Sequence, residues 1–409
     1  MILVPAIFLR VCFFSLVLLV LLEANNTHEG LIYLNNIRHS VGLVKFKSNT
    51  FLQNAATSHA NYLIQNQSIG HYEEKGKYAY TGSTPSERVK KAGYPSAYVM
   101  ENISTNTEGQ VKSINNLFAA IYHRLVFLNF DKDEIGLGFA STHKKKSIKY
   151  TYVYNLASSS VSKLCYQSFA MQSGAYYMRD ICKQKEKMIP QTEYSEAKAF
   201  MQRRSADIIL YPYDKQTNIW PAFYNESPDP LPGYKVSGFP VSVQLNPAYY
   251  KNIQFESFLL YDESTKESIQ SKILQQKNDH NRILKKHEFV LMPLRRLEFD
   301  KEYTAVFEAK ADGRSIKKQW SFRTKNFKET VYRINQKETV LTLKAGSSII
   351  LYIVPTTQAD ILSSYTARGN INVSFLDQNT FRVTLAKKRS LGKSTLYFGE
   401  KRQVSFIEN

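Results

Sequence analysis

The most informative stretch of this sequence reads GHYEEKGKYAYTGSTPSERVKKAGY at 70–94, followed by MENIS at 100–104 and LFAAIYHR at 117–124. It contains the pattern of a helix start, in which Thr84 caps the helix, Pro85 takes the first helical position and Glu87 reaches back to the cap. Gly93 then ends this short helix. The stretch therefore predicts a turn, a capped helix and a strand within one compact layer.

Two histidines and a glutamate, His71, Glu101 and His123, are spread across this stretch. Two imidazoles and one carboxylate are enough to bind a divalent cation such as zinc and to leave one coordination position open. They are also enough for general acid-base chemistry, because histidine titrates near physiological pH. A structural role explains each histidine taken singly. We expect the three side chains to share a cleft and to bind a divalent ion weakly.

The sequence on either side predicts helices and strands of one α/β domain. A helix is expected over Glu29 to His39, and a complete helical stripe is formed by Leu52, Ala55, Ala56, His59, Ala60 and Leu63. Because His59 lies on the apolar face of that stripe, we expect a buried structural histidine rather than a ligand. Val111 to Leu125 predicts a further helix. Strands are expected at IGLGF, residues 135–139, and at 150–156, with a lysine-rich turn around His143 to Lys146 between them.

Six motifs follow one another before IGLGF: LNNIRHSVGL at 34–43, LQNAATSHANYL at 52–63, GHYE at 70–73, YTGSTPSERVKKAGY at 80–94, ENIS at 101–104 and IYHR at 121–124. In this order and spacing they resemble the bacterial branch of the CAP superfamily, which comprises the SCP-like cysteine-rich secretory, antigen 5 and pathogenesis-related proteins. The resemblance covers about residues 29–158 and implies an α-β-α sandwich with a cleft. It matches His71 and His123 to the two family histidines and Glu101 to the glutamate of the ENI motif.

The sequence departs from this family at one functional position. Larger members add a second glutamate on the helix before the last histidine, whereas residues 110–122 here contain no carboxylate. This absence puts in doubt any mechanism that needs two carboxylates. The sequence also lacks a Ser or Cys nucleophile elbow, a GxSxG or HExxH motif and a phosphate-binding loop.

Length and charge set the wider frame. A chain of 409 residues is too long for one ordinary core, so two to four domains are expected. The formal net charge of +19 favours anionic partners such as wall polymers or lipids. Because the basic residues are scattered in pairs and triplets, a solvated basic surface explains them better than a specific nucleic-acid site. The oligomeric state is not indicated by any of these features.

The N-terminus has the pattern of an export signal. Arg10 precedes an apolar run from Val11 to Leu22, which suits a signal-peptide core better than a full membrane span of about twenty residues. Cleavage is expected near Ala24, so residues 1–24 form the signal peptide and Cys12 leaves with it. An uncleaved membrane anchor is the alternative. The expected location is the periplasm, the cell envelope or the exterior.

The remaining cysteines, Cys165 and Cys182, form a lone pair in an exported chain, which predicts one disulfide. The enclosed loop would stabilise the fold by roughly 3 kcal/mol on chain-entropy arguments. Two free thiols or metal ligands are the alternative, although no CxxC spacing supports a zinc ribbon.

The rest of the chain predicts β structure. Residues 159–232 are expected to form a connecting segment, with a helix near 195–203 and no regular structure in the proline-rich passage 221–232. Alternation with period two begins at Val241, and Asp312-Gly313 is a hairpin signal. Residues 233–326 resemble a bacterial Ig-like β-sandwich. Residues 327–409 predict a further β domain with a turn at 377–379. The expected fold class is therefore α+β, with an α-β-α sandwich before the β domains.

The leading functional interpretation is an exported envelope protein that binds a lipid, a wall component or a metal at the His/Glu cleft, without catalysis. One alternative is a metal-assisted hydrolase of peptide or wall substrates, with Glu101 as base or ligand. The other is a structural adhesin in which the β modules carry the function. Turnover that is lost when both histidines are replaced would separate an enzyme from a binding protein.

Overall fold

The computed structural model describes residues 29–386, 393–399 and 402–408. Contacts divide the chain into two compact units. The first reaches to Leu210 and takes in Val243–Ile253 and Ala311–Gly313, and the second comprises Tyr211–Ser242, Gln254–Lys310 and the chain from Arg314 onward. The expected signal peptide, residues 1–24, lies outside the described residues. No helix in the described part of the chain is long and apolar enough to cross a membrane.

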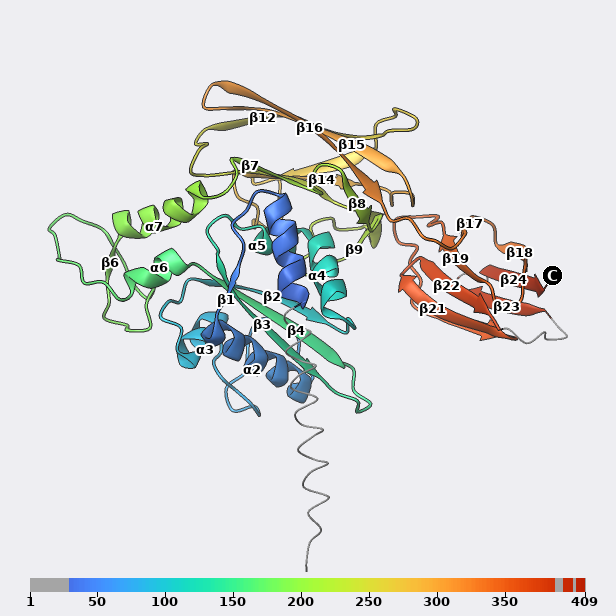
Figure 1. Ribbon diagram of the computed structural model, residues 1–409, viewed down its shortest axis with the longest axis horizontal. Helices are drawn as coiled ribbons and strands as arrows, with labels where there is room; N and C mark the ends of the chain where they lie inside the picture. Colours follow the sequence, from blue (N-terminus) through green and yellow to red (C-terminus); the bar gives the residue numbers. More distant parts are fainter. Residues whose placement is uncertain (1–28, 387–392, 400–401, 409) are drawn as a thin grey trace, which may run out of the picture. The chain divides into compact units, whose positions relative to one another are not determined.

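A four-stranded mixed sheet lies at the centre of the first unit. Its strand order is β1 (Lys47–Ser48), β3 (Glu134–Ser141), β4 (Tyr150–Ala157) and β2 (Val99–Thr105), in which β1 runs parallel to β3 and the other neighbours are antiparallel. The accompanying helices are residues 29–40, α2 (Thr50–Asn66), α3 (Pro85–Ala92), α4 (Gln110–Ala119) and α5 (Ile121–Phe127). Figure 1 shows α2 and α3 on one side of the sheet and α4 and α5 on the other. The predicted α-β-α sandwich is confirmed.

Local sequence explains the two helices that matter most for the site. The predicted stripe of α2 is buried, including His59 with no exposed surface, and Asn49 caps the helix by accepting from the amides of Phe51 and Leu52. At α3, the Thr84 side chain accepts from the Glu87 amide, and Gly93 ends the helix with a φ of 109°. The predicted Thr84 cap and the helix end at Gly93 are therefore confirmed, whereas Glu87 reaches back to the amide of Ser83, one residue before the cap.

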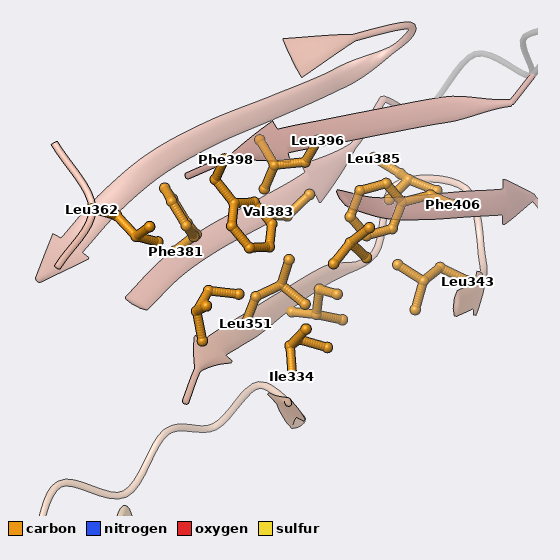
Figure 2. Packing of buried hydrophobic residues seen from close by; sticks show 13 residues of the cluster. Ile334, Leu343, Leu351, Leu362, Phe381, Val383, Leu385, Leu396, Phe398 and Phe406 are labelled. Carbon is orange, nitrogen blue, oxygen red and sulfur yellow. The ribbon is translucent and has the colours of Figure 1, made fainter. Parts of the chain in front are cut away.

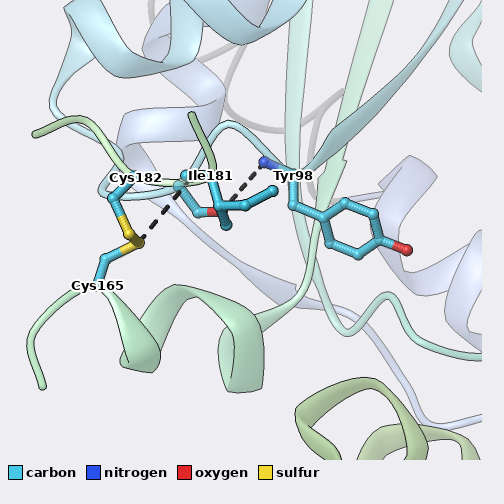
Figure 3. The surroundings of a disulfide bond; sticks show 5 residues. Tyr98, Cys165, Ile181 and Cys182 are labelled. Atoms are coloured by element: carbon cyan, nitrogen blue, oxygen red, sulfur yellow. Dashed lines mark hydrogen bonds between the residues drawn. A yellow bond between two sulfur atoms is a disulfide. The ribbon is translucent and has the colours of Figure 1, made fainter. Parts of the chain in front are cut away.

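The segment after β4 belongs to the first unit as far as Leu210. It contains α6 (Ser159–Leu164), β5 (Tyr177–Met178), β6 (Ile189–Pro190), α7 (Gln191–Arg203) and β7 (Ile208–Tyr211), whose last residue begins the second unit. Cys165 and Cys182 form the predicted disulfide (Figure 3). Amide hydrogen bonds from Ala97 to the Ile181 carbonyl and from Lys183 to the Pro95 carbonyl join the disulfide loop to the strand region before β2. The residues from 159 to 210 are thus packed on the sandwich rather than being only a connector.

The second unit begins with irregular and short β segments. β8 (Gln216–Ile219) precedes β9 (Ala222–Tyr224), which pairs antiparallel with β10 (Val236–Gly238). The expectation of no regular structure in 221–232 is wrong for β9, because its three residues fall between Pro221 and Pro228 and keep the amides that a strand needs.

Two sheets follow in the region expected to be Ig-like. One has the order β12 (Ile253–Asp262), β15 (Glu302–Ala311), β16 (Arg314–Thr324) and β8. In the other, β13 (Ser271–Gln275) pairs antiparallel with β14 (Glu288–Pro293), which neighbours β11 (Val241–Leu245). Asp312 and Gly313 have φ values of 49° and 79°, as expected for the predicted hairpin turn between β15 and β16. The Ig-like assignment itself stays a prediction.

The C-terminal region consists of two four-stranded sheets. The first has the order β17 (Val331–Ile334), β19 (Ser348–Ile353), β22 (Thr380–Leu385) and β21 (Ile371–Asp377), and the second β18 (Glu338–Leu343), β24 (Arg402–Glu408), β23 (Ser394–Phe398) and β20 (Tyr365–Arg368). Leu351, Phe381 and Phe406 belong to the apolar core that these strands enclose (Figure 2). The predicted turn at 377–379 joins β21 to β22.

Candidate functional site

Two of the predicted site residues, His71 and Glu101, are in direct contact through their side chains. His71 lies in the loop after α2, and its Nδ1 is 3.0 Å from Oε1 of Glu101, which β2 supplies. The Glu101 side chain is 1% exposed, whereas that of His71 is 41% exposed. A buried carboxylate therefore holds one edge of a half-exposed imidazole.

Arg88 neutralises this carboxylate from the opposite side. Its Nη2 lies 2.8 Å from both oxygens of Glu101, and its Nη1 donates to the His71 carbonyl at 3.0 Å. Arg88 is on the buried side of α3 and is only 1% exposed. Because an unpaired guanidinium at this depth would be strongly destabilising, α3 and β2 are held together at this ion pair.

A second buried carboxylate, Glu73, lies beside the first. Its Oε1 is 2.9 Å from Nδ1 of His59, and Oε2 accepts from the amides of Thr81 and Gly82 at 2.5 and 3.2 Å. Nε2 of His59 is 3.1 Å from the Gly70 carbonyl and 3.9 Å from Glu101. The expectation that His59 is a buried structural histidine is confirmed. It is also the link between Glu73 and the His71–Glu101 pair.

Asn155 completes the surroundings of Glu101 from β4, directly opposite in the strand register. In the amide orientation that satisfies both of its polar atoms, Asn155 donates to Oε2 of Glu101 at 3.0 Å and accepts from the Ala56 amide at 3.2 Å. The Glu101 carboxylate thus has donors from α3, from β4 and from the His71 loop.

The two buried carboxylates are held ionised by their partners. Burial by itself would raise the pKa of Glu101, but the hydrogen bond with His71 and the charge of Arg88 outweigh it, so the pKa is lowered. Burial would likewise raise the pKa of Glu73, and the hydrogen bonds from His59 and Thr81 lower it instead. Both groups therefore favour the folded state in their charged form.

His123 is the third of the predicted site residues. It lies on α5, and its carbonyl accepts from Nδ2 of Asn102, the residue after Glu101. Among the described residues, no group of three or more His, Cys, Asp or Glu side chains is arranged to hold a metal ion. The structure brings His71 and Glu101 together, but it does not form a three-ligand metal site with His123. Metal binding stays a prediction.

The donor set also argues against Glu101 as a metal ligand. Its two oxygens already accept from Arg88, His71 and Asn155, so a cation would have to displace one of these donors. What the arrangement offers chemically is the His71 ring. With Nδ1 donating to Glu101, the neutral ring presents Nε2 as an acceptor. In the described part of the chain, no hydroxyl or thiol hydrogen-bonds to this ring.

Sequence reasoning missed Arg88 and Glu73. Arg88 was within the predicted capped helix, and its position on the buried side was the available signal. Glu73 is two residues after His71 in a passage that reads as a polar loop. The family's second glutamate is absent from 110–122, yet a second buried carboxylate comes from this loop instead.

Residues 31–156 match the family model described as the cysteine-rich secretory protein family, CAP. This part of the chain is a CAP domain. The matched residues begin within the first helix and end within β4, so they enclose the sheet, α2 to α5 and the His71–Glu101 pair. The match covers less than half of the chain. No curated protein matches the chain.

Several solved structures are similar to part of this chain. An outer surface protein from Borrelia burgdorferi is 19% identical over 33% of this chain and 92% of its own, with a TM-score of 0.29. An extracellular protein containing a SCP domain from Bacillus anthracis is 18% identical over 33% of this chain and 41% of its own, with a TM-score of 0.29. A venom allergen-like protein of Schistosoma mansoni is 14% identical over 32% and 86%, with a TM-score of 0.23.

Proposed function

We propose that this is an exported envelope protein whose CAP domain binds a ligand at His71 and does not catalyse a reaction. The observation that carries the proposal is the geometry around Glu101, whose carboxylate is hydrogen-bonded to His71 and to Arg88. This arrangement fixes the orientation of the His71 ring. Nε2 of the ring is then available to accept a hydrogen bond from a hydroxyl or amide group of a ligand.

The same geometry favours binding over hydrolysis. A general base must be able to take a proton, and Glu101 is buried, neutralised by Arg88 and held with a lowered pKa. A metal-assisted mechanism needs ligands that converge on an ion, whereas Arg88 occupies the oxygens of the carboxylate expected to supply one. The imidazole of His71 is therefore the exposed reactive group of the His71–Glu101 pair.

Two further features support export to the envelope. The apolar run from Val11 to Leu22 follows Arg10 in the pattern of a signal peptide. The Cys165–Cys182 disulfide is typical of oxidising compartments. The net charge of +19 suits an anionic envelope component, and wall polymer is the proposed ligand class for the His71 site.

Sedimentation with purified insoluble wall sacculi tests this proposal. Wild-type protein is expected to co-sediment, and His71→Ala is expected to weaken binding by roughly tenfold, the value of one well-formed hydrogen bond to an oriented group. His39→Ala is the matched control, because His39 is an exposed histidine of the same domain and should bind as the wild type does. Equal binding by His71→Ala would contradict the proposed site.

The same preparation separates binding from catalysis. Soluble fragments released from the sacculi are measured for wild type, His71→Ala and the His71→Ala/His123→Ala double variant. The proposal expects no release above background from any of them. Release by the wild type that is lost in the variants would establish the hydrolase alternative instead.

A further inference from the structure

The loop that joins α2 to α3 exposes an unusual amount of apolar surface. Ile69, Tyr72 and Tyr78 are 74%, 72% and 74% exposed, within ten consecutive residues of the loop. Isolated exposed apolar residues are common on soluble proteins, but a cluster of large ones marks a surface that contacts something apolar. Tyr72 adjoins His71, whereas Ile69 and Tyr78 lie toward the end of α2.

Internal hydrogen bonds hold this loop in place. Asn66, the last residue of α2, donates from Nδ2 to the Tyr78 carbonyl at 2.8 Å. The Glu74 amide donates to the hydroxyl of Tyr62 at 2.8 Å, and the buried Glu73 carboxylate accepts from the far side of the loop at the Thr81 and Gly82 amides. The exposed side chains are therefore presented on a fixed backbone, which lowers the entropy lost on binding.

A basic turn lies beside the same end of α2. The turn between β3 and β4 carries Lys144, Lys145 and Lys146 (Figure 1). Two hydrogen bonds join Gln67 to the backbone of Ile148, and Nζ of Lys146 donates to the Gln65 carbonyl at 3.5 Å. The lysine turn and the start of the exposed loop are thus neighbours although they are far apart in the sequence.

Exposed charge on the two segments is mostly positive. In residues 67–83 and 142–149, Glu74 is the one exposed acidic residue, and it pairs with Lys77 at 3.1 Å. Lys75, Lys144, Lys145 and Lys149 are exposed, and none of them has an ion-pair partner among the described residues. The surface therefore combines apolar side chains with an excess of positive charge.

We propose that this face, defined by Ile69, Tyr78 and Lys144–Lys146, docks the CAP domain onto an anionic lipid bilayer. Tyrosine is favoured at the boundary between headgroups and acyl chains, and lysines beside it are attracted by anionic headgroups. A hydrated polymer would satisfy the lysines but would give Ile69 no apolar environment. The proposal does not involve the His71 ring and is independent of the ligand bound there.

Vesicle sedimentation tests the docking face. The chain beginning at Asn25 is used, because it keeps every described residue and removes the apolar run Val11–Leu22, which would bind lipid by itself. It is mixed with vesicles of phosphatidylcholine alone and with vesicles that also contain phosphatidylglycerol, at low and high salt. We expect binding to the anionic vesicles only, weakened by salt because the charges are exposed.

Two double variants separate the apolar from the electrostatic contribution. Ile69→Ser/Tyr78→Ser and Lys144→Glu/Lys145→Glu are each expected to weaken binding at least roughly tenfold. The matched controls are Leu259→Ser/Val340→Ser, two exposed apolar residues of the second unit, and Lys183→Glu/Lys185→Glu, two exposed lysines that follow Cys182. Both controls should bind as the wild type does. Thermal unfolding of each variant confirms that it is folded.

Four outcomes would overturn the proposal: no binding to anionic vesicles, equal binding to neutral vesicles, unchanged binding by either docking-face variant, or an equal loss in the controls. His71→Ala is expected to keep full vesicle binding, and Lys144→Glu/Lys145→Glu to keep the part of wall binding that depends on His71. Failure of the lipid face and failure of the wall-binding site are therefore distinguished by separate variants and separate probes.

Discussion

At the scale of single residues, Arg88 compensates two buried carboxylates at once. It is bonded to Glu101 at 2.8 Å, and its Nε lies 3.8 Å from Glu73. Arg88→Gln would leave both carboxylates buried without a full positive charge. We predict a loss of about 3–5 kcal/mol in the free energy of unfolding, measured by urea denaturation of the full chain.

Arg203→Gln is the matched control for that measurement. Arg203 forms an ion pair with Glu196 on the same helix, α7, and both side chains are about half exposed or more. Exposed pairs contribute less than about 1 kcal/mol, because water competes for both charges. An Arg88 variant no less stable than this control would show that the buried cluster does not need its cation.

The lowered pKa of Glu101 has a consequence for acid stability. Because the folded-state pKa lies below the unfolded value of about 4.5, the stability contributed by this carboxylate is fully present above pH 4.5 and is lost as the pH falls through the folded pKa. We predict that unfolding free energy decreases less steeply below pH 4.5 in Glu101→Gln than in the wild type. Denaturant unfolding at a series of pH values checks this, and parallel curves would contradict it.

At the scale of elements, α2 packs on β3 at two alternate glycines. A Cβ atom on Gly136 would lie 2.1 Å from the Gln53 amide nitrogen, and one on Gly138 would lie 2.2 Å from the carbonyl carbon of Ala56. Both obstacles are backbone atoms of α2, which cannot rotate away as a side chain could. The IGLGF motif is therefore explained by the close approach of helix and strand.

This contact makes a substitution at Gly138 costly. Gly138→Ala is predicted to lower the free energy of unfolding by about 1–3 kcal/mol or more, because overpacking forces α2 away from the sheet. Ser141→Ala, at the exposed end of the same strand, should change it by less than about 0.5 kcal/mol. Similar urea midpoints for the two variants would mean that α2 adjusts without loss.

The Cys165–Cys182 disulfide closes the loop that follows α6. Cys165 follows α6, and Cys182 lies in the loop bonded to the strand region before β2, seventeen positions later. Closing a loop of this size restricts the unfolded chain, so Cys165→Ser/Cys182→Ser is predicted to lose about 3 kcal/mol of unfolding free energy. Reduction of the wild type should give the same loss. A stable reduced protein would argue that packing alone holds the loop.

At the scale of the whole molecule, the first unit continues beyond the CAP domain to Leu210. The amide of Ala206 donates to the Gly42 carbonyl, and the Asp133 carboxylate accepts from Ser159 at the start of α6. We predict that a chain of residues 25–158 folds cooperatively but unfolds at a lower urea concentration than a chain of residues 25–210. Absence of a cooperative transition for the shorter chain would show that the CAP domain needs the following segment.

Local sequence signals were sufficient to predict most elements of the first unit. The stripe of α2, the Thr84 cap, the Gly93 end of α3 and the lone cysteine pair depend on residues a few positions apart or on simple counting. The motif order also placed His71 and Glu101 in one site. The β strands were predicted less completely, since β9 occurs where prolines were expected to exclude it.

The interactions between the site residues, in contrast, depend on packing between segments that are distant in the sequence. His59, Glu73, Arg88 and Glu101 come from α2, a loop, α3 and β2, and nothing in their spacing says that their charges meet in one buried cluster. The metal site expected from His71, Glu101 and His123 depended on residue type and spacing along the chain. Whether a carboxylate can act as a ligand depends on what neutralises it, and that partner, Arg88, reaches it only when the helix packs against the sheet.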